Sequence, residues 1–366
     1  MQLGVKNNQQ MNKSSINVGL IGFGIGGQVF HAPIITSVDG LRLHKVSARR
    51  PEQLEILQRR YSDTRIVDNA DAIIHADDID LVVVATSNDM HYPFAKAALL
   101  AGKHVVVEKP FTNTTAEADE LIALARQQNL RLSVHHNSRW HSDYLTVQKV
   151  AASGRLGRLV SFEARFDRFR NALRPNAWRE ADLPGSGIWY DLGAHLVDQT
   201  MQLFGLPLAV NADLRIQRPG AGAVDDFDVI LHYPNQLKAS LKGSMLVKEP
   251  TPRYALYGMD GAFVKPGVDP QEAALRAGLS PKGDPDWGKE PREIWGKLNV
   301  LENGEDRIEY VESERGDYPA FYRNIYDAIA NGKELAVLPE HARNVIYVIE
   351  MAEKSWAERR TVDLQF

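Results

Sequence analysis

The sequence contains no cysteine among its 366 residues. This absence excludes disulfide bonds, thiolate catalysis and cysteine-ligated metal sites, although it does not identify the compartment. Long apolar runs are also missing, and none approaches the roughly 18 to 20 residues needed to span a bilayer. The first fifteen residues, 1–15, are polar and lack the apolar segment of a secretory signal. We therefore expect a disordered lead-in and a cytoplasmic protein.

A large excess of charge of either sign is absent as well, since the formal net charge is −4. Nothing in this balance attracts the chain to nucleic acid or to an anionic membrane surface. Small molecules are therefore the expected partners. With 44% hydrophobic and 25% charged residues, the composition is that of a globular protein, and the length suits two domains.

The first part of the chain, residues 16–138, alternates short β-branched runs with amphipathic segments, which is typical of βαβ units. The expected buried strands are Val18 to Ile21, Leu43 to Val46, Leu81 to Ala85, His104 to Val107 and Leu132 to Val134. Helices are expected at Pro51 to Tyr61, Tyr92 to Ala101 and Thr115 to Gln128, where apolar residues recur at intervals of three and four residues. The fold class is therefore α/β, with an N-terminal doubly wound parallel sheet of the Rossmann type.

The pattern changes in residues 139–366, which we interpret as an α+β domain for substrate binding and oligomerisation. After a helix at Tyr144 to Ala152, the strands predicted with few helices between them are Val160 to Phe169, Ala209 to Gln217, Asp228 to Tyr233, Leu237 to Lys242 and Arg253 to Tyr257. This spacing indicates a mostly antiparallel sheet. A helix is expected at 189–204, a long loop at 278–296, and a final helix at 339–358 that can pack back on the first domain.

A glycine-rich loop directly follows the first predicted strand and matches the pattern G-x-G-x-x-G. Its residues are Gly22, Phe23, Gly24, Ile25, Gly26 and Gly27. Gly22 permits a tight turn, Gly24 lets the backbone approach a pyrophosphate, and Gly27 lets the next helix pack closely. The motif alone is weak and fits a structural turn, but its position between a strand and a helix predicts a dinucleotide site.

The end of the second strand should contact the ribose of that dinucleotide. An acidic residue there suits the free hydroxyl of NAD, and an arginine suits the 2′-phosphate of NADP. Here the strand ends in Ser47 and is followed by Arg49 and Arg50, with no acid before Glu52. A pair of solvated arginines is the alternative reading. NADP is therefore the preferred cofactor, and NAD remains the alternative.

Two further segments carry a family resemblance. One is Ala85-Thr86-Ser87-Asn88-Asp89-Met90-His91 with the later Glu108-Lys109-Pro110, and the other is Tyr190-Asp191-Leu192-Gly193-Ala194-His195. With them the chain, from about Asn17 to Leu364, resembles the glucose-fructose oxidoreductase, inositol dehydrogenase and rhizopine-catabolism (Gfo/Idh/MocA) family. Residues 257–272 resemble the branch with NADP-linked scyllo-inositol dehydrogenases. Where those relatives have Gly-Gly before the aspartate motif, this chain has Gly185-Ser186-Gly187-Ile188.

The resemblance implies roles for individual residues. Lys109, Asp191 and His195 match the catalytic centre of the family. The residues that it places beside the cofactor, in addition to Lys109, are Thr86, Asn88, His91 and Glu108. It also implies a cis peptide bond between Lys109 and Pro110 and no metal ion.

General chemistry supports these roles independently of the family. Removing a hydride from an alcohol requires the hydroxyl proton to leave, and His195 can accept it because an unperturbed histidine has a pKa near 6.5. Asp191 lies four residues earlier, so on a helix both side chains share one face and the aspartate can orient the imidazole or bind a substrate hydroxyl. Lys109 can polarise the reacting oxygen, and it is the rival proton acceptor. Taken alone, each of these three residues also fits a purely structural role. Asp191, for example, can cap the helix.

A pocket for a ring with many hydroxyls needs hydrogen-bond donors and aromatic faces. The residues nominated for it, besides Asp191 and His195, are Asn137, Arg139, Trp140, Trp178, Arg179 and Tyr190. The nearby His135, His136 and His141 lack the carboxylate arrangement of a zinc site, so no metal is predicted.

The sequence thus predicts an oxidoreductase that moves a hydride between a nicotinamide dinucleotide and a hydroxyl or carbonyl carbon of a polyol, inositol or sugar. Two alternatives stay open: a glycosidase-like enzyme that uses a held nicotinamide, and a non-catalytic nucleotide sensor on the same fold. On family analogy, a homodimer or homotetramer is expected.

Overall fold

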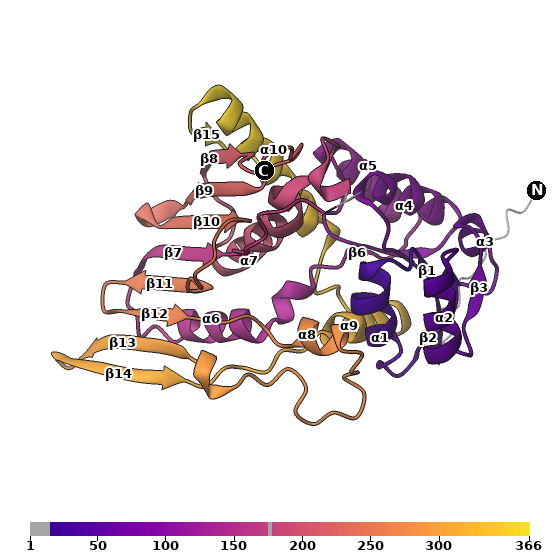
Figure 1. Ribbon diagram of the computed structural model, residues 1–366, viewed down its shortest axis with the longest axis horizontal. Helices are drawn as coiled ribbons and strands as arrows, with labels where there is room; N and C mark the ends of the chain where they lie inside the picture. The colour runs from indigo at the N-terminus through magenta and orange to yellow at the C-terminus, as the bar shows by residue number, and fades with distance from the viewer. Residues whose placement is uncertain (1–14, 175–177) are drawn as a thin grey trace, which may run out of the picture.

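The computed structural model describes residues 15–174 and 178–366. The expected disordered lead-in therefore lies outside the described residues, apart from Ser15. Two sheets divide the described chain between them, and Figure 1 shows them at opposite ends of the molecule, with α7 between them. Within these described ranges, no helix is both long and apolar enough to cross a membrane.

The first sheet has six parallel strands in the order β3-β2-β1-β4-β5-β6. The strands are β1 (Ile16–Ile21), β2 (Leu41–Ser47), β3 (Arg65–Val67), β4 (Leu81–Val84), β5 (His104–Val107) and β6 (Leu132–Val134). The helices beside them are α1 (Ala32–Ile35), α2 (Pro51–Arg60), α3 (Asp71–Ile74), α4 (His91–Leu100) and α5 (Thr115–Gln127). This confirms the predicted doubly wound sheet, whose central strands are apolar because helices cover both faces.

Local sequence explains several boundaries in this domain. Helix α5 begins at a capping box, in which Thr114 Oγ1 accepts from the Glu117 amide and the Glu117 carboxylate accepts from the Thr114 amide. Proline stands at the start of α2, where its missing N–H costs nothing. The Lys109-Pro110 peptide bond is cis, as predicted.

The second sheet has nine strands in the order β14-β13-β12-β11-β7-β10-β9-β8-β15. Its strands are β7 (Leu159–Arg165), β8 (Ala209–Arg215), β9 (Asp226–His232), β10 (Lys238–Ser244), β11 (Tyr254–Gly258), β12 (Gly261–Lys265), β13 (Gly296–Glu302), β14 (Glu305–Val311) and β15 (Val362–Asp363). All neighbours run antiparallel except β7 and β10. The predicted mostly antiparallel sheet is therefore confirmed.

Helices of the second part of the chain cover one face of this sheet and also reach the first domain. They are α6 (Ser142–Ala152), α7 (Ala194–Phe204), α8 (Gln271–Arg276), α9 (Pro319–Ala330) and α10 (Pro339–Glu358). A five-residue π-helix, Trp189–Gly193, leads directly into α7. Short 3-10 turns lie at Asn88–Met90, Asn137–Trp140, Trp178–Glu180, Pro234–Gln236 and Arg292–Ile294.

Helix α10 joins the two hydrophobic cores. Ala342 and Ile346 belong to a core beneath the parallel sheet, whereas Val345 and Ile349 belong to the core of the large sheet. Their spacing of three and four residues places the two pairs on adjacent stripes of one helix. Figure 1 shows α10 running from the parallel sheet toward β8. Helix α10 thereby fixes the first sheet against the second domain.

Candidate active site

The glycine-rich loop has the close backbone approaches that its sequence predicts. Gly22 has φ +96°, and a Cβ atom there would lie 2.5 Å from the carbonyl oxygen of Ala85. A Cβ atom on Gly27 would lie 2.3 Å from the carbonyl oxygen of Gly22. At Gly24 nothing described lies within 4 Å of that position, so a ligand can reach the backbone. This geometry fits a dinucleotide whose phosphates contact the loop and the helical segment that begins at Gly26.

The two arginines after β2 lie at the surface beside this loop. Both are exposed, and Arg49 Nε donates to the Asp68 carbonyl at 2.6 Å. Arg50 immediately precedes α2 in an extended conformation, and Ser47 is half-buried at the end of β2. Neither guanidinium pairs with a carboxylate of the described chain, so both can contact a phosphate.

Three residues that the resemblance places beside the cofactor hold the loops around it. Asn88 Nδ2 donates to the Gly185 carbonyl at 2.6 Å and so ties the first domain to the segment before the π-helix. His91 is buried, and its Nδ1 lies 2.8 Å from the Pro110 carbonyl oxygen. Thr86 Oγ1 donates to the Ser87 carbonyl at 3.2 Å.

Glu108 forms a buried network with two histidines. Its Oε1 lies 3.0 Å from His31 Nε2 and 3.0 Å from His135 Nδ1, and its Oε2 accepts from the Lys109 amide at 2.8 Å. Burial alone would raise the pKa of Glu108, but hydrogen bonds from His135 and His31 outweigh it and hold the pKa well below its usual value. The group has the close spacing of metal ligands. The side chains of this group are already hydrogen-bonded to protein partners, however. Besides the two bonds to Glu108, His31 Nδ1 lies 2.6 Å from the Tyr322 hydroxyl.

Lys109 and Asp191 form an ion pair across the two domains. Lys109 Nζ donates to Asp191 Oδ1 at 2.8 Å and to the Asp191 carbonyl oxygen, also at 2.8 Å. Burial alone would raise the pKa of Asp191, but the Lys109 and Arg179 charges overcome it and hold the pKa far below its ordinary value. The carboxylate is therefore ionised at neutral pH. Two bonds to one residue fix the ammonium group in place.

Asp191 lies in a π-turn and not in the regular helix that the sequence predicted. In a π-helix each amide bonds five residues back, so the turn is wider than an α-turn. The Trp189 ring packs directly against Gly193. A Cβ atom on residue 193 would lie 2.2 Å from this ring, so only glycine fits there. The wider turn presents both the carbonyl and the carboxylate of Asp191 to Lys109.

His195 is oriented by Ser138 and not by Asp191. His195 Nδ1 lies 2.9 Å from Ser138 Oγ, and the side chain is buried, with 9% of the residue exposed. Nε2 has no protein partner in the described parts of the chain and is not among the fully enclosed atoms, so a ligand can reach it. The expectation that Asp191 orients the imidazole is thereby corrected, because the aspartate is held by Lys109 instead.

The expected titration of His195 near neutral pH also needs correction. Burial lowers its pKa well below 6.5, and the Lys109 charge lowers it further. The imidazole is therefore neutral at physiological pH. A neutral imidazole with a free Nε2 can accept a proton, and its protonated form returns that proton readily.

Of the nominated substrate residues, Arg139 and Trp140 have other partners. The buried Arg139 donates to both carboxylate oxygens of Asp198, at 2.8 and 2.6 Å, and to the Ala336 carbonyl at 2.9 Å. Trp140 packs edge-on against Phe321 in the core of the first domain. The Arg139 side chain is therefore occupied by protein partners, which corrects its expected contact with substrate, whereas the half-buried Trp140 stays a predicted contact. Asn137 is buried beside them.

Tyr190 bonds to helix α10, whereas Arg179 and Trp178 lie near the ion pair. The Tyr190 hydroxyl donates to Glu353 Oε2 of α10 at 3.3 Å, and its contact with substrate stays a prediction. Arg179 Nε lies 3.6 Å from Asp191 Oδ1, and its guanidinium stacks 4.7 Å from the Trp178 ring. Arg179 thus faces the same space as Lys109.

Two site residues escaped the sequence reasoning. Phe166 follows β7, and its ring centroid lies 6.3 Å from that of His195. The guanidinium of Arg168 lies 5.5 Å from the same Phe166 ring. Strand alternation was the available signal, because Phe162, Ala164, Phe166 and Arg168 share one face. Nothing in the sequence showed that this face meets His195.

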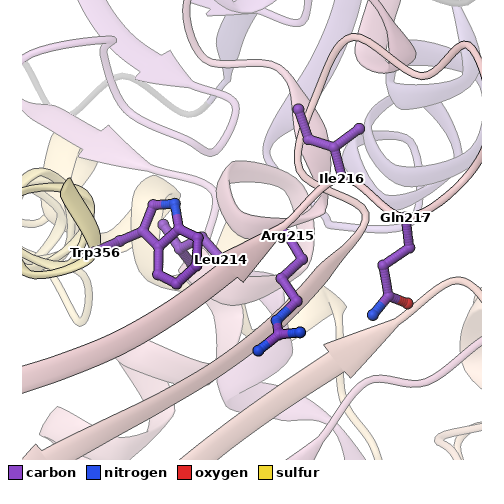
Figure 2. A pocket seen from close by; sticks show the side chains of 5 residues that line it. All are labelled: Leu214, Arg215, Ile216, Gln217 and Trp356. Carbon is purple, nitrogen blue, oxygen red and sulfur yellow. The ribbon is translucent and has the colours of Figure 1, made fainter. Parts of the chain in front are cut away.

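A shallow hollow on the large sheet is separate from this site. Figure 2 shows Trp356 of α10 beside four residues that end β8 and follow it. They are Leu214, Arg215, Ile216 and Gln217. None of the catalytic candidates lines this hollow, so we do not assign the reaction to it.

Comparisons with known proteins agree with this geometry. Residues 16–136 match the model of an oxidoreductase family with an NAD-binding Rossmann fold, and residues 149–364 match its C-terminal alpha/beta domain. Scyllo-inositol 2-dehydrogenase (NADP(+)) IolW of Bacillus subtilis is 38% identical over 96% of each chain. The uncharacterized oxidoreductase YdgJ of Escherichia coli is 43% identical over 96% of this chain and 99% of its own. The solved oxidoreductase YvaA of B. subtilis superposes with a TM-score of 0.92 at 38% identity, covering 96% of this chain and 99% of its own.

Proposed function

The chain belongs to the Gfo/Idh/MocA oxidoreductase family, and on that premise we propose that it transfers a hydride between NADP(H) and a hydroxyl or carbonyl carbon of a polyol, inositol or sugar. One observation carries the proposal. Lys109 and His195 come from different domains and lie close enough for the Lys109 charge to lower the pKa of His195, while Asp191 fixes Lys109 at 2.8 Å and Ser138 holds His195.

The bound nicotinamide would supply the hydride acceptor, and the protein must handle the proton and the charge. The ammonium group of Lys109, fixed in place by Asp191, stabilises the negative charge that develops on the reacting oxygen. His195 receives the hydroxyl proton at Nε2, while Ser138 holds Nδ1 and fixes the ring plane. In the reductive direction the protonated imidazole returns that proton.

A panel assay tests this function directly. Inositols, aldoses and keto-sugars are offered with NADP, NADPH, NAD and NADH, and the change in reduced-nicotinamide absorbance is followed. Turnover with at least one member, abolished in Lys109→Met, is the expected result. Tight nicotinamide binding with no turnover of any member, and no difference between wild type and Lys109→Met, would instead favour a nucleotide sensor.

The preference for NADP rests on Ser47, Arg49 and Arg50. Both guanidinium groups are exposed beside the expected ribose position, and no acidic residue stands there to bind the free hydroxyl of NAD. The B. subtilis relative is named for NADP(+), which supports the same assignment. Cofactor affinity measured for both dinucleotides decides between them.

An oligomer is proposed from the open face of the large sheet. Large apolar side chains are exposed there, including Tyr257, Leu301, Ile308 and Tyr310. Such a surface is typical of an interface between subunits. Light scattering during size-exclusion chromatography should give the mass of a dimer or tetramer, and a Tyr310→Lys variant should shift it toward the monomer.

A further inference from the structure

The segment that leaves β7 is rich in arginine. Within fifteen residues it carries Arg165, Arg168, Arg170, Arg174 and Arg179. Arg165 is neutralised, since its Nη1 lies 3.1 Å from Asp167 Oδ2. Of the others, Arg168 and Arg179 lie near the site residues.

Arg168 has no carboxylate partner within the described parts of the chain. Its guanidinium lies against Phe166, the ring that also neighbours His195. It is close enough to Asp191 that its charge helps to lower the pKa of that carboxylate. Arg168 therefore lies on the cleft side of the sheet, near the reacting groups.

Arg179 extends this positive region from the other side. Its side chain is 51% exposed, and only Nε approaches Asp191, at 3.6 Å. Asp191 is already bound by Lys109 at 2.8 Å. One carboxylate cannot neutralise three cations, so positive charge remains in the cleft.

Neighbouring carboxylates supply only part of the missing negative charge. Asp225 pairs with Arg218, whose Nε lies 2.9 Å away, and Glu180 lies 3.6 Å from the same arginine. Burial lowers the pKa of Arg170, and the charges of Arg174 and Arg168 lower it further, while the Glu180 charge offsets them only in part, so these arginines repel one another. Partly buried like charges destabilise a site unless an anion binds between them.

We propose that the substrate carries a carboxylate or phosphate group that Arg168 and Arg179 bind, while the carbon to be oxidised lies between Lys109 and His195. This assignment rests on the proposed function and narrows its substrate class to acidic sugars and sugar phosphates. Guanidinium groups suit this task because their planar donors match a carboxylate or phosphate in paired hydrogen bonds.

The phosphates of the cofactor are the competing explanation for this charge. They are expected at the glycine-rich loop, whereas Arg168 and Arg179 surround Asp191. Saturating the protein with NADPH separates the two explanations, because the cofactor phosphates are then already in place. Thermal melting of this holoenzyme with added inorganic phosphate reports anion binding without turnover.

We expect phosphate to raise the Tm of the wild-type holoenzyme and not that of Arg168→Gln. The matched control is Arg158→Gln, an exposed arginine before the opposite end of β7, which should behave as wild type. Equal Tm shifts in wild type and Arg168→Gln overturn the proposal. A loss of NADPH affinity in Arg168→Gln also overturns it, because the arginine then serves the cofactor.

Kinetics test the same proposal on substrate. The kcat/KM is measured for a hexose, for its uronate and for its 6-phosphate. Comparing the uronate with the 6-phosphate identifies which anion is preferred. In wild type an acidic member should exceed the neutral one, and Arg168→Gln should reduce that ratio about 10- to 100-fold. A ratio unchanged in Arg168→Gln contradicts the subsite and leaves the proposed function standing. If neither neutral nor acidic sugars are turned over while phosphate still binds, the proposed function is contradicted and the anion site is not.

Discussion

The cofactor side and the substrate side of the cleft are built in different ways. The glycine-rich loop is one continuous segment, and one of its close approaches joins residues 22 and 27 within the same turn, while the other joins Gly22 to the end of the neighbouring strand at Ala85. The substrate side brings together Lys109, Ser138, Phe166 and His195 from four separate segments. A short motif can therefore specify the first region, whereas the second exists only once both domains are packed.

Removing the Lys109 charge should produce a large effect on the substrate side. In Lys109→Met, Asp191 loses its strongest partner and the reacting oxygen loses its cation. Loss of one such electrostatic group lowers kcat by about 10² to 10³. Steady-state kinetics should show this loss while NADPH affinity, which the first domain provides, changes little. A comparable loss of NADPH affinity would show that the two sides are not separable.

A methyl group in the loop should act on the cofactor side instead. In Gly27→Ala the new Cβ would lie 2.3 Å from the Gly22 carbonyl oxygen, so the loop must shift. Such overpacking costs about 1 to 3 kcal/mol, which is on the order of 5- to 100-fold in affinity. Fluorescence titration with NADPH measures it. Gly102→Ala is the control, because its Cβ meets nothing within 4 Å and only its φ of +76° is strained. Unchanged NADPH affinity in Gly27→Ala would count against the assignment of the loop.

The arginines after β2 should affect one dinucleotide and not the other. Replacing Arg49 and Arg50 together by alanine removes charge-assisted contacts to the 2′-phosphate, which are worth about 1.5 to 3 kcal/mol. NADPH affinity should fall on the order of tenfold to a hundredfold, and NADH affinity should stay within about twofold. Equal losses for both dinucleotides would contradict the NADP assignment.

The smallest effect is expected at Ser138, which orients the imidazole without touching substrate. Ser138→Ala removes the hydrogen bond to His195 Nδ1 and should lower kcat by about 3- to 30-fold, a loss worth about 0.7 to 2 kcal/mol. Ser138→Thr keeps the hydroxyl and should recover part of the rate. Equal kcat values for the alanine and threonine variants would show that this hydroxyl does not position the ring.

The same contrast explains how much the sequence predicted. The five expected strands of the first sheet are present because each is a buried apolar run between turn signals. Strand β3 was missed because Arg65–Val67 is too short to show a pattern. Strands β12, β13 and β14 were missed as well. The hairpin of β13 and β14 carries many charges, and β14 is largely exposed on both faces, so alternation is weak.

The site was predicted to the extent that motifs specify it. Lys109 and Asp191 were placed by the resemblance, and the structure brings them together. The role of Ser138 depends on a contact across 57 residues, and the position of Arg168 near Asp191 depends on how the chain folds back, so no local pattern shows them. The lowered pKa of His195 likewise follows from burial, which appears only in the folded chain.

The pH dependence of kcat/KM for alcohol oxidation tests the catalytic account most directly. His195 acts in its neutral form, so the rate should fall as the pH drops through its pKa. Because burial and Lys109 lower that pKa, the acid limb should lie well below pH 6.5, with a plateau through neutrality. His195→Ala should lower the rate by about 10² to 10⁴ and abolish this limb, whereas Lys109→Met should lower the rate and retain it. An unchanged profile and near-normal turnover in His195→Ala would contradict the account and make Lys109 the proton acceptor.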